Sequence, residues 1–179
     1  TPAWVVGTYD AQGKPNVMTA AWAGICCSKP PSVTVSLRKA TYTFGNIEAR
    51  RAFTVNVASA AQVEAVDYFG IVSGRDTDKL ADAGLTPVRS KLVDAPYVEE
   101  FPLVLECKLI HAIEIGLHTA FIGEIMDVKV DEALLGEKRT VDVAQLNPLI
   151  FAPKQSTYYA LGEAVGTAFS VGKELKETI

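Results

Sequence analysis

The stretch LVLECKLIHAIEIGLHTAFIGEIMDVKV, residues 103–130, carries the strongest structural signal in the sequence. From Leu103 to Leu109, apolar residues alternate with polar ones such as Glu106, which is the period of two typical of a β-strand. Gly116 interrupts this pattern, and Thr119 to Val130 then read as a second strand that runs back. The stretch therefore predicts a long antiparallel hairpin.

Further strands are expected before this hairpin, where short apolar and β-branched runs alternate with turn residues. Asp10-Ala11-Gln12-Gly13 and Pro30-Pro31 mark two of the turns. We expect strands at four ranges: 4–9, 16–26, 32–37 and 53–57.

Helices are expected only in the connections between strands. Thr43 is expected to cap a helix that ends at Arg50, a capping box opens a helix over 59–69, and a third, short helix lies between Asp78 and Gly84. Strands outnumber helices. The sequence therefore predicts one mainly β domain, residues 1–179, folded as a barrel with short helices in its connections.

Composition and charge exclude several classes of protein. Lys and Arg number 17 against 21 Asp and Glu, and basic residues do not cluster with aromatic ones, so we expect no nucleic-acid partner. No apolar run approaches the roughly 20 residues that span a bilayer, and the basic-then-apolar pattern of a leader does not open the chain. We therefore expect a cytoplasmic protein with no membrane partner.

The three cysteines form neither a disulfide framework nor a CxxC pattern. Cys26 and Cys27 are adjacent, and neighbouring strand residues point to opposite faces, so a disulfide between them would be strained. We expect buried, reduced thiols at these positions and at Cys107, and no metal site.

The segment SLRKATYT, residues 36–43, places two cations and several hydroxyls where a strand ends and a helix begins. The N–H groups and partial positive charge at a helix N-terminus attract a phosphate, and an Arg side chain can bind it with two hydrogen bonds. From these residues alone, a solvated basic turn is as plausible as an anion site, and Thr43 alone is more often only a helix cap.

Several ordered blocks together resemble the flavin reductase-like FMN-binding split-barrel family, and within it the flavoredoxin group. The similarity covers nearly the whole chain, and ordered blocks are more specific than any single one. The blocks lie at residues 16–22, 36–43, 53–57, 72–80, 105–107 and 116–125.

This resemblance implies FMN bound without a covalent bond, near the interface of a homodimer. It implies that the phosphate is held by the segment that follows the third strand. The residues implied are Arg38, Lys39 and Thr43, with help from Ser36, and with Leu37 and Tyr42 in the same segment.

The resemblance also implies a second set of flavin contacts. The strand that starts near Thr19 would run along the isoalloxazine ring and offer backbone groups to it; its residues are Met18, Thr19, Ala20, Ala21 and Trp22. Asn56 and Lys79 occupy family-like positions near the flavin. For Asn56, a structural hydrogen bond at a strand end is an equal alternative, and an isolated aromatic residue such as Trp22 is more often part of a core.

Two histidines are candidates for a chemical role, because only histidine titrates near neutral pH without a large perturbation. His111 lies among apolar residues and is expected to be packed. His118 follows Gly116 where the family motif approaches the flavin ring, so it is the candidate catalytic residue. Leu117 replaces the usual Asp of that motif, and a turn residue with a partly exposed ring is the alternative for His118.

The resemblance implies an oxidoreductase in which FMN takes a hydride from NAD(P)H and passes electrons to a second flavin or to an acceptor. The alternative is a flavoredoxin-type electron carrier that is reduced by a redox protein and not by nicotinamide. A barrel that only stores flavin is a third, weaker expectation.

Overall fold

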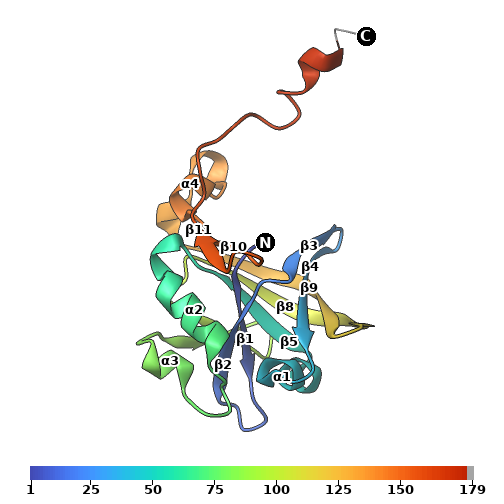
Figure 1. Ribbon diagram of the computed structural model, residues 1–179, viewed down its shortest axis with the longest axis vertical. Coiled ribbons are helices and arrows are strands. Elements are labelled where there is room, and N and C mark those ends of the chain that lie inside the picture. The colour runs from blue at the N-terminus through green and yellow to red at the C-terminus, as the bar shows by residue number, and fades with distance from the viewer. Residues whose placement is uncertain (177–179) are drawn as a thin grey trace.

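A seven-stranded antiparallel sheet dominates the computed structural model, which describes residues 1–176 (Figure 1). Its strands lie in the order β2-β1-β5-β8-β9-β4-β3. Their bounds are β1 (Trp4–Tyr9), β2 (Pro15–Ala20), β3 (Ala23–Ser28), β4 (Pro31–Arg38), β5 (Ala52–Val57), β8 (Leu103–Ile115) and β9 (His118–Val130). The expected long hairpin is the β8–β9 pair, which turns at Gly116 and Leu117.

The sheet curls, so that its two edge strands are consecutive in sequence. Strands β2 and β3 lie at opposite edges of the sheet, yet only Ala21 and Trp22 separate them in sequence. The Ser36 N–H donates a hydrogen bond of 2.8 Å to the Trp22 carbonyl, which ties this crossing to β4. The expected mainly β split barrel is confirmed. The single strand expected over 16–26 is wrong, because the chain must bend at this crossing.

Within residues 1–176, four short α-helices lie in the connections: α1 (Tyr42–Arg50), α2 (Val63–Ile71), α3 (Lys79–Asp82) and α4 (Val143–Leu146). The capping box before α2 and the Asp78 cap of α3 are both present. The expected cap of α1 is wrong by two residues, because Thr41 occupies the N-cap position. Thr43 instead lies in the first turn of α1, and its buried hydroxyl accepts a hydrogen bond of 2.9 Å from Asn16 Nδ2.

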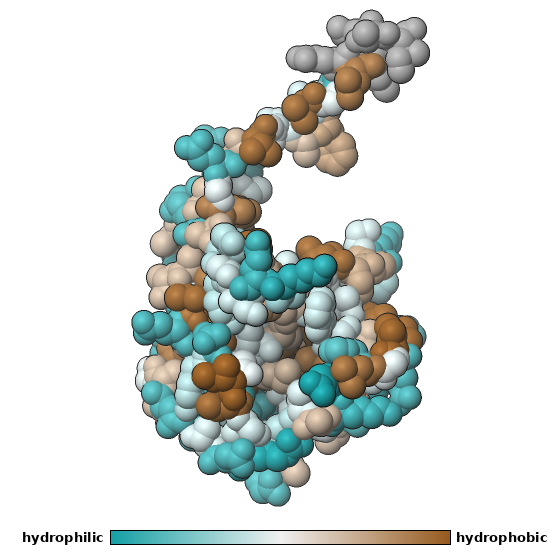
Figure 2. Space-filling model, viewed as in Figure 1, coloured by the Kyte–Doolittle hydropathy of each residue, from teal (hydrophilic) through white to brown (hydrophobic). Residues whose placement is uncertain are grey.

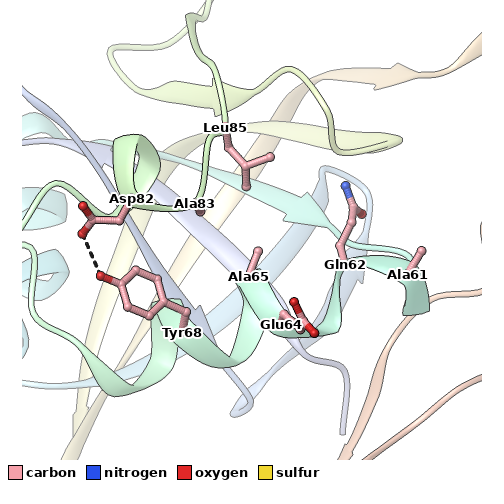
Figure 3. Close-up of a pocket in the computed structure, with 8 residues that line it drawn as sticks. All are labelled: Ala61, Gln62, Glu64, Ala65, Tyr68, Asp82, Ala83 and Leu85. Carbon is pink, nitrogen blue, oxygen red and sulfur yellow. Dashed lines mark hydrogen bonds between the residues drawn. The ribbon is translucent and has the colours of Figure 1, made fainter.

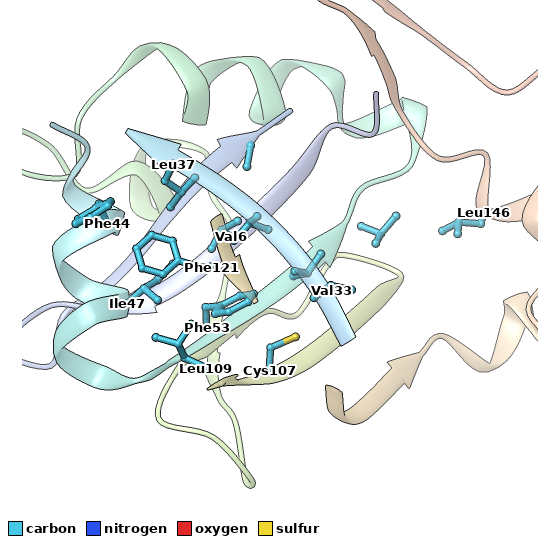
Figure 4. Close-up of a cluster of buried hydrophobic side chains, with 14 residues drawn as sticks. Val6, Val33, Leu37, Phe44, Ile47, Phe53, Cys107, Leu109, Phe121 and Leu146 are labelled. Atoms are coloured by element: carbon cyan, nitrogen blue, oxygen red, sulfur yellow. The ribbon is translucent and has the colours of Figure 1, made fainter. Parts of the chain in front are cut away.

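Two hydrophobic cores hold the elements together. The first lies inside the curled sheet, where Phe53 and Phe121 are fully buried and the Phe44 ring meets Phe121 edge-on at 5.0 Å (Figure 4). The second lies between α2 and the strands β1 and β2, around Val66 and Phe69. Full burial of each such side chain contributes roughly 1.5–3 kcal/mol, so the two cores fix the sheet on both of its faces.

Three side chains expected to be packed are exposed. His111 lies on β8 beyond the last buried residue of that strand, Leu109, where the hairpin extends past the core. Cys26 and Cys27 lie on the edge strand β3, and only Cys107 is buried. The β3–β4 register shifts between Ile25 and Cys27, so a bulge interrupts the strict alternation of faces that the sequence argument assumed.

The smaller elements have no clear signal in the sequence. The strands β6 (Pro87–Arg89) and β7 (Pro96–Val98) form one small hairpin, and β10 (Ile150–Ala152) and β11 (Thr157–Tyr159) form another. Four 3₁₀ turns complete the described chain: η1 (Ala60–Gln62), η2 (Glu132–Leu134), η3 (Glu137–Arg139) and η4 (Lys173–Lys176). Within residues 1–176, the helices are all too short or too polar to cross a membrane.

Candidate flavin site

The segment 36–43 joins the end of β4 to the start of α1, as the sequence predicted. The Thr41 side chain turns back to donate to the Arg38 carbonyl at 2.9 Å. Among the described residues, no side chain caps the N-terminus of α1. The first N–H groups of this helix are therefore open to an anion.

Arg38 and His118 lie side by side at one end of the sheet. They are direct partners in the β4–β9 ladder, and the next pair on the same face is Ser36 with Ala120. The Trp22 ring meets the His118 ring edge-on, with 6.3 Å between the ring centroids. The Arg38 side chain is exposed, and His118 is half-buried. This face therefore combines a free cation, an imidazole and an aromatic ring.

A cavity of about 250 Å³ lies against the same segment. Met18, Tyr42, Thr43 and Lys79 of the predicted set line it, together with residues 69–75 from the end of α2 and the loop that follows. Gly74 is required here, because a Cβ atom at this position would lie 1.9 Å from Asn16 Oδ1.

Arg75 is a residue of this cavity that the sequence reasoning missed. Its guanidinium lies 5.1 Å from the centre of the Tyr42 ring and donates a hydrogen bond of 3.1 Å to the Ala40 carbonyl. It therefore adds a second exposed arginine beside the start of α1. The block 72–80 was the available signal, but a polar loop alone does not indicate which segment its arginine will contact.

Asn16 leaves a polar atom without a partner at the cavity. Its Nδ2 donates to Thr43 Oγ1 at 2.9 Å, while its buried Oδ1 has no hydrogen-bond partner within the described part of the chain. A buried acceptor without a partner costs free energy unless a ligand or water supplies a donor. A cavity lined by such an acceptor, hydroxyls and cations suits a polar ligand that carries both hydroxyls and a phosphate.

Lys79 is buried behind this cavity. Its ammonium group donates a hydrogen bond of 2.9 Å to the carbonyl of Phe69, near the C-terminus of α2. Burial disfavours the charged form and lowers the pKa of Lys79 to about 8. The side chain therefore fixes the end of α2, where the wall of the cavity begins.

Lys39 points to the hairpin and not to the cavity. Its ammonium group pairs with Glu114 Oε1 at 2.5 Å on the surface, and this hydrogen bond raises the pKa of Lys39. An exposed ion pair of this kind contributes little stability, so the lysine can be released at small cost.

Several predicted side chains lie in the interior instead of facing a ligand. Leu37 and Ala20 belong to the first core. Thr19 Oγ1 donates to the carbonyl of Val66. Asn56 is fully buried: its Nδ2 donates to the Val5 carbonyl, and its Oδ1 accepts from the backbone of β7 at 2.8 Å. The structural alternative for Asn56 therefore fits this geometry, and Ala20, Leu37 and Thr19 retain only backbone groups for a ligand.

A second, larger hollow of about 420 Å³ lies between α2 and α3 (Figure 3). Tyr68 donates a hydrogen bond of 2.7 Å to Asp82 across it, and Glu64 adds a second carboxylate to its lining. Hydrogen bonds from Thr77 and Tyr68 lower the pKa of Asp82. None of the predicted site residues lines this acidic hollow, so it does not suit a phosphate.

Comparison with known proteins defines the class of this fold and site. The flavin reductase like domain matches residues 1–160, and the chain therefore belongs to this family. Among solved structures, the flavoredoxin of Desulfovibrio vulgaris (Miyazaki F) is 57% identical, with a TM-score of 0.92 over 96% of this chain and 92% of that chain.

Two further relatives extend the comparison. Flavoredoxin from Methanosarcina acetivorans is 28% identical, with a TM-score of 0.89 over 97% of this chain and 91% of that chain. A high molecular weight rubredoxin of Moorella thermoacetica is 29% identical over 84% of this chain and 60% of its own length.

Proposed function

We propose that this chain binds FMN and passes electrons through it. The observation that carries the proposal is the uncapped N-terminus of α1, with Arg75 beside it and Arg38 three residues before the N-cap residue Thr41. Two guanidinium groups and a set of backbone N–H groups match the charge and the acceptors of a terminal phosphate. The cavity of about 250 Å³ is smaller than the roughly 300–1,000 Å³ of sites that enclose a whole ligand, so we assign it to one end of the nucleotide.

The isoalloxazine ring is assigned to the face that carries Trp22 and His118. Bound FMN supplies the hydride and electron chemistry, so the protein has only to bind, orient and shield it. The backbone from Thr19 to Trp22 offers hydrogen-bonding groups to the polar edge of the ring. In this assignment, Arg38 connects the two halves of the site, because it lies on the same face as His118 and ends the strand that leads to the phosphate segment.

His118 is the catalytic residue of the proposal. Its ring is half-buried and held on one side by Trp22, while its β-ladder partner is the cation Arg38. An imidazole in this position can orient an electron donor, or stabilise negative charge that develops beside it during reduction. Cofactor retention would then depend on the phosphate segment, and the rate of reduction on His118.

A redox protein is the electron donor that we favour. Two flavoredoxins are similar over more than nine tenths of the chain, and one relative is named as a rubredoxin. NAD(P)H is the second candidate donor, and the family name, flavin reductase like, favours it.

Anaerobic reduction distinguishes the two donors. The purified protein is mixed with NADH, NADPH, a reduced rubredoxin or dithionite, and the flavin absorption band near 450 nm is followed. If a redox protein is the donor, reduced rubredoxin and dithionite bleach the band within seconds, while the nicotinamides do not. Rapid bleaching by NADH or NADPH would contradict this assignment and support the second candidate.

We further propose that the chain forms a homodimer. The hairpin face, which we define as Trp22, Ile113, Ile115 and Leu117, exposes four large apolar side chains near the tip of β8–β9. The outer edge of β3 also has no neighbouring strand within the described sheet. Large exposed apolar patches and open strand edges are features of surfaces that pair with a second copy.

A further inference from the structure

The last described residues form an extended arm that stands clear of the body. This C-terminal arm, residues 160–176, begins after β11 and runs away from the sheet (Figure 1). It is anchored at its base, where the Leu161 N–H donates 3.0 Å to Asn147 Oδ1. Hydrogen bonds from Ser170 and Val171 to the Thr167 carbonyl then give it local turns.

The arm carries large apolar side chains that are exposed to solvent. Val165 is 101% exposed and Phe169 is 97% exposed, and Val171 and Leu175 are also exposed. Figure 2 shows hydrophobic residues following one another along the arm, separated from the body by open space. Burying each Val or Phe side chain changes an equilibrium by about 10-fold or more. We therefore expect these exposed apolar side chains to bind to another protein surface.

The hairpin face offers such a surface. Ile113 and Ile115 are two residues apart on β8 and so share a face, and Ile115 is the β-ladder partner of His118. Trp22 adjoins His118, and Leu117 lies in the turn between the strands. The four apolar residues therefore lie near the tip of the hairpin, and two of them, Trp22 and Ile115, lie next to His118 of the proposed site.

A second copy of the chain is the occupant that fits both surfaces. Each copy has one arm and one hairpin face, so two copies related by a two-fold axis satisfy both at once and leave none exposed. The 17-residue arm reaches up to about 55 Å when extended, which is enough to cross a domain whose radius of gyration is about 15 Å. Arm and face together approach the roughly 20–30 residues a side of a stable interface.

We propose that the C-terminal arm of each copy docks on the hairpin face of the other, beside its Trp22 and His118. This inference rests on the proposed homodimer and adds the surfaces that form it. It also makes the flavin site of one copy incomplete without the arm of its partner. The family match ends at residue 160, so the arm's side of this contact lies beyond the region that the family match covers.

Crosslinking from the arm tests the exchange directly. The photoreactive residue p-benzoylphenylalanine replaces Phe169 in the full chain. This protein is mixed with ¹⁵N-labelled copies, the two are left to exchange subunits or are refolded together, and the mixture is irradiated. We expect a product of twice the chain mass in which position 169 is joined to a peptide of the other isotope containing residues 113–117 or Trp22. The same probe at exposed Leu92 is the control and should give no such product.

Crosslinks within one chain, or to another surface of the second copy, would overturn the proposal. A second measurement uses the paired substitution Val165→Ser and Phe169→Ser, which should raise the dimer dissociation constant at least about 100-fold, since two arms are lost per dimer. Lys173→Ser, on the same arm, should change it less than about 3-fold. If the variant with the paired substitution stays as dimeric as the control, the arm exchange is wrong but the homodimer stands. If the unaltered chain is monomeric, the arm exchange and the homodimer are both wrong. FMN binding is judged separately.

Discussion

Arg38, through its carbonyl, and Arg75, through its guanidinium, both contact the segment just before α1. Arg38 ends β4, whereas Arg75 comes from the loop after α2 and is held against Tyr42 and the Ala40 carbonyl. Phosphate binding at a helix N-terminus is dominated by charge-assisted hydrogen bonds, each contributing about 1.5–3 kcal/mol. The affinity for FMN should therefore depend on these side chains, whereas that for riboflavin should not.

Replacing Arg38 by Ala should weaken FMN binding by about 10- to 150-fold, because one charge-assisted contact to the phosphate is lost. Riboflavin lacks the phosphate, so its affinity should change less than about 3-fold. Fluorescence titration of both flavins measures the difference, and Arg139→Ala, in an exposed turn, is the matched control. An equal loss for FMN and riboflavin would show that Arg38 acts on the ring or on the fold.

Replacing His118 by Ala should leave FMN occupancy unchanged but slow reduction of the flavin by about 10- to 1,000-fold, the range that one positioned polar group supplies. Stopped-flow reduction by whichever donor, reduced rubredoxin or a nicotinamide, bleaches the unaltered protein gives the rate. His111→Ala is the control, because this histidine lies on the exposed part of β8. A normal rate at normal occupancy would mean that His118 is only a structural residue at the start of β9.

The buried Lys79 should make stability depend on pH. Its folded-state pKa is lowered to about 8 from the ordinary 10.5, so between these values the unfolded chain binds more protons and stability rises with pH. Below pH 8 the full cost of burying the charge is present. Urea unfolding gives the free energy of unfolding of the protein and of Lys79→Met. The difference between these two free energies should change by on the order of 2–3 kcal/mol from pH 8 to 10.5. A constant difference would mean that Lys79 keeps an ordinary pKa.

At the scale of single elements, the β8–β9 hairpin was predicted correctly because its signal is local. Both parts of the signal are read from neighbouring residues: the alternation from Leu103 to Leu109, and the turn glycine Gly116. The break at Ala21 and Trp22 has no such signal, since it results from the joining of two distant sheet edges. The exposure of His111 also depends on where the sheet ends, and residue type does not indicate this.

Gly123 on β9 is one of the positions where the sheet is closely packed. A Cβ atom at this position would lie 2.5 Å from the Phe53 ring in the first core. Gly123→Ala should therefore lower the free energy of unfolding by about 1–3 kcal/mol, as overpacking does. Gly24→Ala on β3 is the matched control, because a Cβ atom there meets nothing within 4 Å. Equal stability of the two variants, measured by urea unfolding, would show that Phe53 moves away freely.

At the scale of the whole molecule, the site is assembled from segments that are far apart in sequence. The cavity joins the start of α1, the strand β2 and the loop after α2. The sequence indicated the segment 36–43 through its composition, and the other blocks only through resemblance. It could not indicate that Asn56 and Leu37 point inward or that Arg75 reaches Tyr42, because these are consequences of how distant elements pack.

Identification of the bound flavin tests the central claim most directly. The protein is purified without added cofactor, denatured, and its released flavin is separated by chromatography beside FMN, FAD and riboflavin. The account predicts a yellow protein that releases FMN at close to one molecule per chain, because the uncapped N-terminus of α1, with Arg75 beside it and Arg38 just before it in the chain, suits a terminal phosphate. A colourless protein that also fails to bind added FMN, or one that prefers riboflavin, would contradict it.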